Sequence, residues 1–127
     1  MKKYILILLI ILLVGCSDKE DLKCERNFYN DGLNYKEKIV VKMNNDKVSS
    51  LKSYLTFESE ENASSYCDSL KKYIAYNNIN IEYECIGNEI EVNNYEKYIA
   101  VDNPNTIIGL SREEFIKLFT EFKYACQ

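Results

Sequence analysis

Apolar and polar residues alternate along the first part of the chain with the period of two that is typical of β-strands. Segments 22–29 and 33–43 flank residues 30–32, Asn-Asp-Gly, which favour a hairpin turn because Gly readily adopts positive φ. A second polar turn at 44–47 leads into segment 48–58. The pattern therefore predicts a meander of three antiparallel strands. Its apolar face comprises Tyr35, Ile39, Val41, Met43, Leu51, Leu55 and Phe57.

The period changes to that of a helix after residue 58. Ser59 suits the N-cap position, and Glu60 and Glu61 in the first turn complement the helix dipole. Apolar residues then recur at spacings of three and four, until an Asn-Asn pair at 77–78 ends the predicted helix. The apolar face of this helix comprises Ala63, Tyr66, Cys67, Leu70 and Ile74.

The remaining sequence predicts a second hairpin and a second helix. Segments 79–85 and 89–92 alternate on either side of a Gly-Asn turn. Residues 93–109 show no clear period, although their apolar positions allow a turn of helix. Ser111 and Glu114 form a capping-box sequence before an apolar stripe, which we interpret as core rather than as a ligand site. The stripe comprises Phe115, Leu118, Phe119 and Phe122.

The predicted elements follow one another in the order βββ-α-ββ-α. This order indicates an α+β domain in which an antiparallel sheet carries two helices packed on one face. No Gly-Pro-rich linker and no repeat divides the chain, so we predict a single folded domain over residues 23–127.

The chain begins with a pattern typical of a secreted lipoprotein. Two lysines precede the unbroken apolar segment 4–14, which is shorter than the roughly 20 apolar residues of a membrane-spanning helix. The following Gly15 and Cys16 resemble the cleavage and lipidation site of bacterial lipoproteins. We therefore expect a cleaved signal peptide at 1–15 and a lipidated tether at 16–22. An ordinary signal peptide with a chance cysteine is the alternative.

A lipid on Cys16 would tie the mature chain to a membrane without spanning it. Two or more acyl chains anchor a protein stably, since each buried methylene contributes about 0.8 kcal/mol. We expect a protein on the extracytoplasmic face of the cell membrane, with the membrane itself as partner through the lipid anchor. Ser17 does not distinguish a plasma-membrane from an outer-membrane lipoprotein.

The composition of the chain limits its partners. The formal net charge is −4 at pH 7, and loss of the two N-terminal lysines makes the mature chain more acidic. We therefore expect no binding to nucleic acid, which requires a basic surface. The chain has 11 Tyr but no His and no Trp. The tyrosines reflect either an AT-rich genome, which we favour, or a tyrosine-rich binding surface.

Four of the five cysteines remain once Cys16 is assigned to lipid. An even number outside the cytoplasm indicates two disulfides, for which sequence alone allows three connectivities. Cys67 lies on the apolar face of the predicted helix and Cys85 on the apolar side of the next strand, so we expect these two to pair. Cys24 and Cys126 would then join the two ends of the domain. The spacings of the four cysteines match no zinc-binding pattern.

An acidic patch on the second hairpin is the best candidate for a binding site in the sequence. Glu82, Glu84, Glu89 and Glu91 project from the face opposite the apolar residues of this hairpin. Four carboxylates on one face could collect Ca²⁺ or a basic partner, but calcium ligands usually converge from loops. We interpret the patch as a solvated strand face, and we predict no metal site and no cofactor.

The sequence contains no recognisable catalytic constellation. Without His, neither a Ser-His nor a Cys-His pair can form, and no G-x-S-x-G motif occurs. Glycosidic hydrolysis by paired carboxylates needs a cleft with about 5–9.5 Å between the two groups, which a flat hairpin does not provide. We therefore predict that the protein is not an enzyme. We also interpret four lysines as solvated rather than as an anion site: Lys36, Lys38, Lys42 and Lys47.

Three segments resemble the small YehR-like bacterial lipoproteins, in their cysteine-containing Gram-positive form. They are LKCERNF at 22–28, NNDKVSSLKSYLTFESEENASSYCDSLKKY at 44–73, and IIGLSREEFIKLFTEFKYACQ at 107–127. The resemblance implies an α+β core with cysteines near the start, in the helix and at the end, together with a membrane location. It implies no catalytic residues.

These observations lead to an expected function. We expect a lipid-anchored extracytoplasmic protein that acts as a binding or interaction module at the cell envelope, with a partner that the sequence does not identify. Two alternatives stay open. One is a small envelope hydrolase that uses carboxylates or Tyr, and the other is a structural spacer that needs only its fold and its anchor.

Overall fold

The computed structural model describes residues 22–30, 32–102 and 106–127. The predicted signal peptide, the predicted lipidation site at Cys16 and the predicted tether, apart from Leu22, lie outside these described residues. The elements in chain order are β1 (Leu22–Asn30), β2 (Leu33–Asn44), β3 (Lys47–Phe57), α2 (Glu60–Tyr76), β4 (Tyr83–Ile86), β5 (Glu89–Asn93), α3 (Tyr95–Asp102), α4 (Arg112–Glu121) and β6 (Ala125–Cys126).

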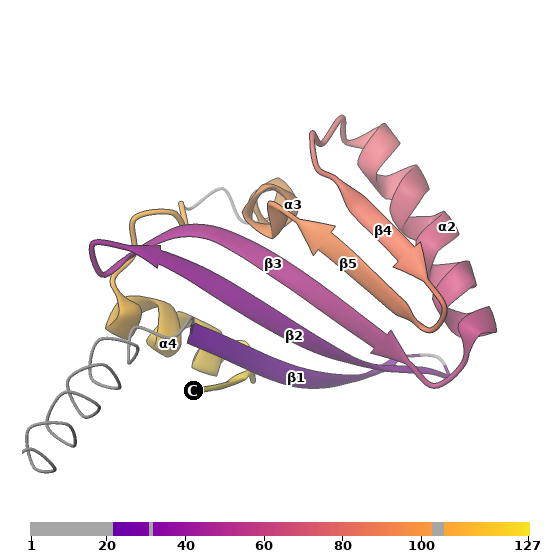
Figure 1. The fold of residues 1–127 in the computed structure, drawn as a ribbon, viewed down its shortest axis with the longest axis horizontal. Helices are drawn as coiled ribbons and strands as arrows, with labels where there is room; N and C mark the ends of the chain where they lie inside the picture. The colour runs from indigo at the N-terminus through magenta and orange to yellow at the C-terminus, as the bar shows by residue number, and fades with distance from the viewer. Residues whose placement is uncertain (1–21, 31, 103–105) are drawn as a thin grey trace, which may run out of the picture.

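The strands form one antiparallel six-stranded sheet with the order β4-β5-β3-β2-β1-β6 (Figure 1). The predicted α+β class and the order βββ-α-ββ-α are therefore confirmed. The structure adds the short helix α3 within the segment that shows no clear period, and the two-residue strand β6 at the C-terminus.

The turn between β2 and β3 shows why the first hairpins form where the sequence predicts. Asn45 and Asp46 both have positive φ, of 52° and 60°, which matches the right-handed twist of the flanking strands. Gly32, between β1 and β2, has φ of 79°, a conformation that strains any residue with a Cβ. A register shift between Lys42 and Met43 accompanies the β2–β3 turn.

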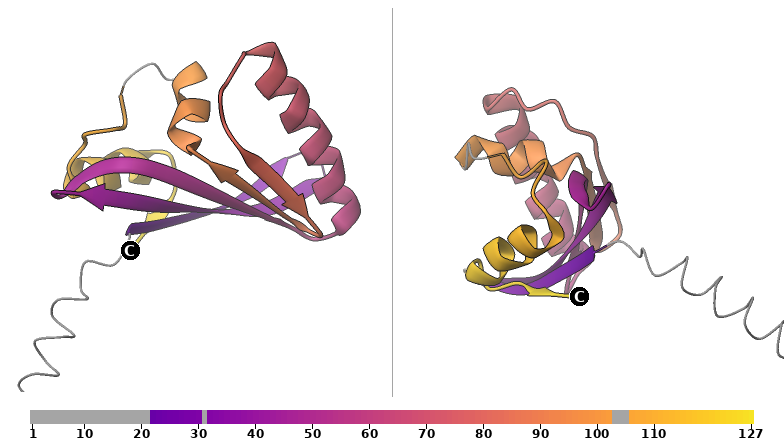
Figure 2. Two further views of the ribbon diagram at one scale, coloured as in Figure 1. Left: turned by 45° about the horizontal axis from the view of Figure 1, so that its top comes forward. Right: turned by 90° about the vertical axis from the view of Figure 1, so that its left-hand side faces the viewer.

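The three helices of the described residues, α2, α3 and α4, lie on the concave side of the twisted sheet (Figure 2). Helix α4 covers the end of the sheet near β1 and β2, whereas α2 runs beside β4 and β5 (Figure 1). Both helices pack on the same face, because the strand residues that they bury are alternate residues along β2 and β3. This arrangement leaves the lysines of β2 on the other face of the sheet.

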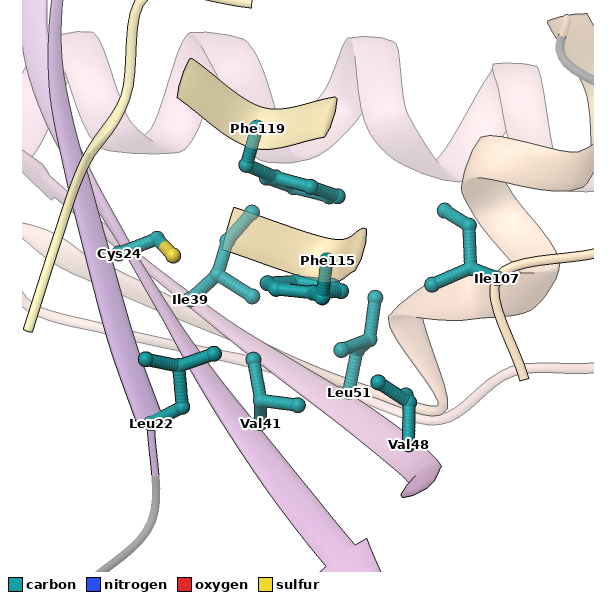
Figure 3. Packing of buried hydrophobic residues seen from close by; sticks show 9 residues of the cluster. All are labelled: Leu22, Cys24, Ile39, Val41, Val48, Leu51, Ile107, Phe115 and Phe119. Atoms are coloured by element: carbon teal, nitrogen blue, oxygen red, sulfur yellow. The ribbon is translucent and has the colours of Figure 1, made fainter. Parts of the chain in front are cut away.

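The buried apolar residues form two separate clusters. In the α4 cluster, the stacked rings of Phe115 and Phe119, with centroids 4.1 Å apart, cover Ile39 and the neighbouring strand residues (Figure 3). Phe115 and Phe119 of the predicted stripe are thus core, and each fully buried large side chain contributes about 1.5–3 kcal/mol, whereas Leu118 is half-buried and Phe122 is exposed. In the α2 cluster, Leu70 covers a second set of strand residues. The α2 cluster comprises Leu55, Phe57, Ala63, Leu70, Ile90 and Val92.

The predicted caps begin the two longer helices. The Ser59 hydroxyl accepts a hydrogen bond from the Asn62 backbone N–H at 3.1 Å at the start of α2. Ser111 and Glu114 each accept a hydrogen bond from the other's backbone N–H at 3.2 Å, which completes the capping box of α4. An N-cap of this kind contributes about 1 kcal/mol.

Two disulfides join distant parts of the domain, and they are the pairs expected from the sequence. Cys24 of β1 is bonded to Cys126 of β6 across 102 residues of sequence, and these two residues are also directly opposed in the sheet. Cys67 of α2 is bonded to Cys85 of β4, 18 residues away. The first disulfide fixes the C-terminus to the sheet, and the second fixes α2 to the edge strand.

Candidate functional site

A polar centre separates the two apolar clusters. Glu37 of β2 and Ser53 of β3 are the buried polar residues in the described part of the chain, with 4% and 0% of their surfaces exposed. Both lie on the concave face, because Glu37 is two residues from Ile39 along β2 and Ser53 is two residues from Leu55 along β3, and residues two apart share a face of the sheet. A carboxylate is therefore held in the middle of the face that the helices cover.

Above this polar centre lies a cavity of about 310 Å³, which we call the tyrosine pocket. Its lining comes from β1, β2, all three helices and the segment before β6. The polar lining groups are Glu37, Arg26 and tyrosine hydroxyls, and the rest of the lining consists of aromatic rings and one aliphatic side chain. The lining tyrosines are Tyr35, Tyr66, Tyr95, Tyr98 and Tyr124, and the other lining residues are Phe28, Ile99, Phe119 and Phe122.

The carboxylate of Glu37 accepts three hydrogen bonds from hydroxyl groups. The Tyr124 hydroxyl donates to Oε1, and the Tyr95 hydroxyl donates to Oε2 at 3.1 Å. The Ser53 hydroxyl also donates to Oε2, at 3.0 Å. A carboxylate has about four lone-pair positions, so most of the hydrogen-bonding capacity of Glu37 is used within the domain.

Burial shifts the pKa values of this network in one direction. Loss of solvent raises the pKa of Glu37, and the three hydroxyl donors together with the charge of Arg26 offset this shift only in part. Burial, followed by the negative charge of Glu37, also raises the pKa of Tyr95 and of Tyr124. The two tyrosines therefore stay protonated and act as donors at neutral pH.

The chain reverses sharply after α4 to bring Tyr124 to this carboxylate. Lys123 has a positive φ of 72°, and the backbone N–H of Tyr124 donates to the Phe119 carbonyl at 2.9 Å. The following residues enter β6, which pairs with β1 and carries the Cys126 disulfide. The disulfide and the short strand thus hold one wall of the pocket in place.

Helix α3 carries the opposite wall. Asn94 has a positive φ of 52° directly after β5, and the helix starts at Tyr95. The side chain of Glu96 then accepts a hydrogen bond from the Leu51 backbone N–H at 3.1 Å, which ties α3 to β3. The rings of Tyr95 and Tyr98 are stacked with centroids 5.3 Å apart. The wall is therefore a pair of aligned rings on a short, anchored helix.

Arg26 lies directly opposite Glu37 in the β1–β2 ladder, but the two side chains are not paired. The guanidinium of Arg26 lies 4.3 Å from the centroid of the Phe28 ring, and its Nη1 donates to the Phe122 carbonyl at 2.7 Å. The ion pairs found within residues 22–30, 32–102 and 106–127 join other groups, Lys36 with Glu25 and Lys52 with Glu91. The pocket therefore contains a carboxylate and a guanidinium that do not form an ion pair with each other.

The remaining tyrosines complete an aromatic frame. The rings of Tyr35 and Tyr66 have centroids 5.3 Å apart, and Tyr35 is stacked on Phe28 at 5.0 Å. Aromatic contacts of this kind contribute about 0.5–1.5 kcal/mol beyond the area that they bury. Burial raises the pKa of Tyr35, Tyr66 and Tyr98 as well, so their hydroxyls are neutral.

The acidic patch expected from the sequence lies elsewhere, on the opposite face of the sheet. Glu84 is directly opposite Glu91, and both line a hollow of about 260 Å³ with Glu89. Glu82 does not line this hollow; its backbone carbonyl accepts a hydrogen bond from Asn93. Glu91 forms an ion pair with Lys52 at 2.5 Å. Within the described ranges, no group of three or more His, Cys, Asp and Glu side chains is arranged to hold a metal ion.

No family model, no curated protein and no solved structure matches this chain. The resemblance to YehR-like lipoproteins therefore stays a prediction from the sequence segments alone. Among the helices of the described residues, none is long and apolar enough to cross a membrane.

No local sequence pattern predicts the tyrosine pocket, although the sequence contains one signal for it. Glu37 occupies a position in the apolar phase of a strand, between Tyr35 and Ile39, where a charged residue requires buried partners. Arg26 similarly occupies the inward phase of β1 between Cys24 and Phe28. The hydroxyl partners of Glu37 come from positions too distant in sequence for any local pattern to reveal them.

Proposed function

We propose that this protein is a lipid-anchored, extracytoplasmic binding domain whose tyrosine pocket holds a small organic ligand. The observation that carries the proposal is the pocket itself, a cavity of about 310 Å³ lined by aromatic rings around a buried carboxylate. Ligand sites in proteins typically combine a mainly apolar lining with a few fixed polar groups and titratable groups of shifted pKa.

The rigidity of the pocket supports a binding role. Tyr124 and Tyr95 are each held by a hydrogen bond to Glu37, and the walls that carry them are fixed by the Cys24–Cys126 disulfide and by the Glu96 contact with β3. A pocket whose side chains are already ordered loses less conformational entropy when a ligand binds. The same features would be unnecessary in a spacer that needs only a fold and an anchor.

The location of this domain is supported by the sequence. Segment 1–15 is typical of a cleaved signal peptide, and Cys16 follows directly at the expected lipidation site. The disulfides of the folded domain are consistent with an oxidising compartment outside the cytoplasm. The acyl chains on Cys16 would hold the pocket close to the extracytoplasmic surface of the cell membrane, where it would meet ligands of the cell envelope.

A catalytic role has less support than a binding role. Among the described residues that line the tyrosine pocket, Glu37 is the one carboxylate, and hydrolysis by paired carboxylates needs a second. The carboxylate of Glu37 is also occupied by three hydroxyl donors, which leaves it poorly placed to act as a base. We therefore propose binding without chemistry.

Filling the pocket with a larger side chain tests this function. Ile99 lines the pocket without contributing a polar group, so Ile99→Trp should block ligand entry and leave the Glu37 network intact. Ile108 is 40% exposed and does not line the pocket, so Ile108→Trp is the matched control. The measurement is native mass spectrometry of each protein purified from its own membranes, together with a thermal-shift screen of small aromatic compounds. Equal ligand retention by the two variants would contradict the proposal.

A further inference from the structure

We propose that the ligand of the tyrosine pocket is a planar apolar molecule with an anionic group, and that Arg26 binds this group. This inference rests on the function proposed above and adds the chemical class of the ligand. Two charged side chains line the pocket, Arg26 and Glu37, and the choice between an anionic and a cationic ligand depends on which of them is free to bind.

Glu37 is the less available of the two. It is 4% exposed, and its oxygens already accept from Tyr124, Tyr95 and Ser53. A ligand ammonium group that paired closely with this carboxylate would have to displace at least one hydroxyl donor. A hydrogen bond to a charged group is worth roughly ten- to a hundredfold in an equilibrium constant, so this displacement would cancel much of the gain.

Arg26 has donors to spare. A guanidinium carries five N–H groups, and in the described structure one hydrogen bond is made, from Nη1 to the Phe122 carbonyl. The side chain is half-buried where it lines the pocket, and it is held there by its contact with the Phe28 ring and by its hydrogen bond to the Phe122 carbonyl. A planar guanidinium held in this way can bind a carboxylate, phosphate or sulfonate through two parallel hydrogen bonds.

The walls of the pocket fit the rest of such a ligand. The stacked rings of Tyr95 and Tyr98 and the tilted pair of Tyr35 and Tyr66 present aromatic surface on which a planar group can stack. The hydroxyls of Tyr35, Tyr66 and Tyr98 are kept protonated by burial and are donors for the acceptor atoms of an anion.

Three probes with the same ring and different charges test this inference. The mature lipidated protein is placed in phosphatidylcholine nanodiscs and titrated calorimetrically with 2-naphthoate, 2-naphthalenemethanol and 2-naphthylmethylammonium, with empty nanodiscs as the blank. We expect 2-naphthoate to bind most tightly. In Arg26→Gln its affinity should fall roughly ten- to a hundredfold, whereas the affinity of the neutral alcohol should change by less than about twofold.

Lys38→Gln is the matched control, because it removes the same charge from the opposite face of the sheet, where Lys38 lies near Tyr54. This variant should bind 2-naphthoate like the unchanged protein. Arg26→Lys keeps the charge and should retain part of the affinity, which tests the role of Arg26 even if Arg26→Gln folds poorly.

The outcomes separate this inference from the proposed function. If 2-naphthylmethylammonium bound most tightly and Glu37→Gln abolished that binding, the ligand would be a cation and the inference would be wrong, while the binding function would stand. Equal loss of 2-naphthoate affinity in Arg26→Gln and Lys38→Gln would also overturn it. If no probe bound above the blank and Ile99→Trp retained as much native ligand as Ile108→Trp, both the inference and the proposed function would fail.

Discussion

The Tyr124 hydroxyl donates a hydrogen bond to the carboxylate of Glu37, although the two residues are 87 positions apart in the sequence. Glu37 belongs to the centre of the sheet, and Tyr124 belongs to the C-terminal segment that Cys126 ties to β1. This contact joins the polar centre of the domain to one wall of the tyrosine pocket. It therefore links the stability of the fold to the shape of the candidate site.

Removing this hydroxyl should destabilise the domain. In Tyr124→Phe, Glu37 would lose one of its three donors while its carboxylate stays buried. A hydrogen bond to a charged group contributes about 1.5–3 kcal/mol, and we expect the free energy of unfolding in urea to fall by about that amount. Tyr29 is 78% exposed, so Tyr29→Phe is the control and should change the free energy by less than about 0.5 kcal/mol. Equal effects of the two substitutions would show that the contact does not stabilise the fold.

The raised pKa of Glu37 makes a prediction about pH. The ordinary pKa of this carboxyl is 4.5, and burial raises it in the folded state, so the folded state binds the proton more tightly than the unfolded chain does. The contribution of Glu37 to stability is therefore greatest below the ordinary pKa and is lost as the pH rises through the raised value. The measurement is the difference in unfolding free energy between the unchanged protein and Glu37→Gln from pH 4 to pH 8. As the pH rises, the unfolding free energy of the unchanged protein should fall relative to that of Glu37→Gln.

Glu114 serves as a control because its pKa shift has the opposite sign to that of Glu37. Its pKa is lowered by the hydrogen bond from the Ser111 backbone N–H, so its contribution to stability is present above the ordinary pKa and is lost as the pH falls. As the pH rises, the unfolding free energy of the unchanged protein should therefore increase relative to that of Glu114→Gln. If both difference curves had the same slope, the assignment of the raised pKa to Glu37 would be wrong.

The sheet and the two longer helices could be predicted from the sequence because their signals are local. The alternation along β2 and β3 and the capping box at Ser111 and Glu114 are each contained within a short segment. Helix α3 is not clearly predicted, since its apolar residues are divided between the two clusters, which leaves no single apolar stripe. Ile99 contacts the α4 cluster, Tyr98 contacts the α2 cluster, and Tyr95 contacts both. Strand β6 has two residues and forms only because β1 and a disulfide hold it.

The candidate site was harder to predict than the fold because its contacts are long-range. Ser53, Tyr95 and Tyr124 are 16, 58 and 87 residues from Glu37, and no periodic pattern relates them. The acidic patch is recognisable in the sequence because its four glutamates are close together. A single Glu in the apolar phase of a strand was the more informative signal, since a buried charge must be satisfied by partners from elsewhere.

The two disulfides should differ in their effect on stability. The loop closed by Cys24 and Cys126 spans 102 residues, and the loop closed by Cys67 and Cys85 spans 18. In the loop-entropy model the first contributes about 4.7 kcal/mol and the second about 3 kcal/mol. We expect the double variant Cys24→Ser/Cys126→Ser to lower the free energy of unfolding more than Cys67→Ser/Cys85→Ser does. The Cys24→Ser/Cys126→Ser variant should also bind 2-naphthoate more weakly, because the first disulfide holds the segment that carries Tyr124. The reverse order of the two variants, in either measurement, would contradict this prediction.

The proposed membrane anchor is tested at Cys16. In Cys16→Ser no thiol is available for the acyl groups, so the protein should leave the membrane fraction, and metabolic labelling with palmitate should fail. The folded domain begins after this residue, and the described residues hold both disulfides and both apolar clusters, so circular dichroism and thermal unfolding should be unchanged. Ser17→Ala is the control and should stay lipidated and membrane-bound. A Cys16→Ser protein that remained lipidated in the membrane fraction would show that the anchor lies elsewhere.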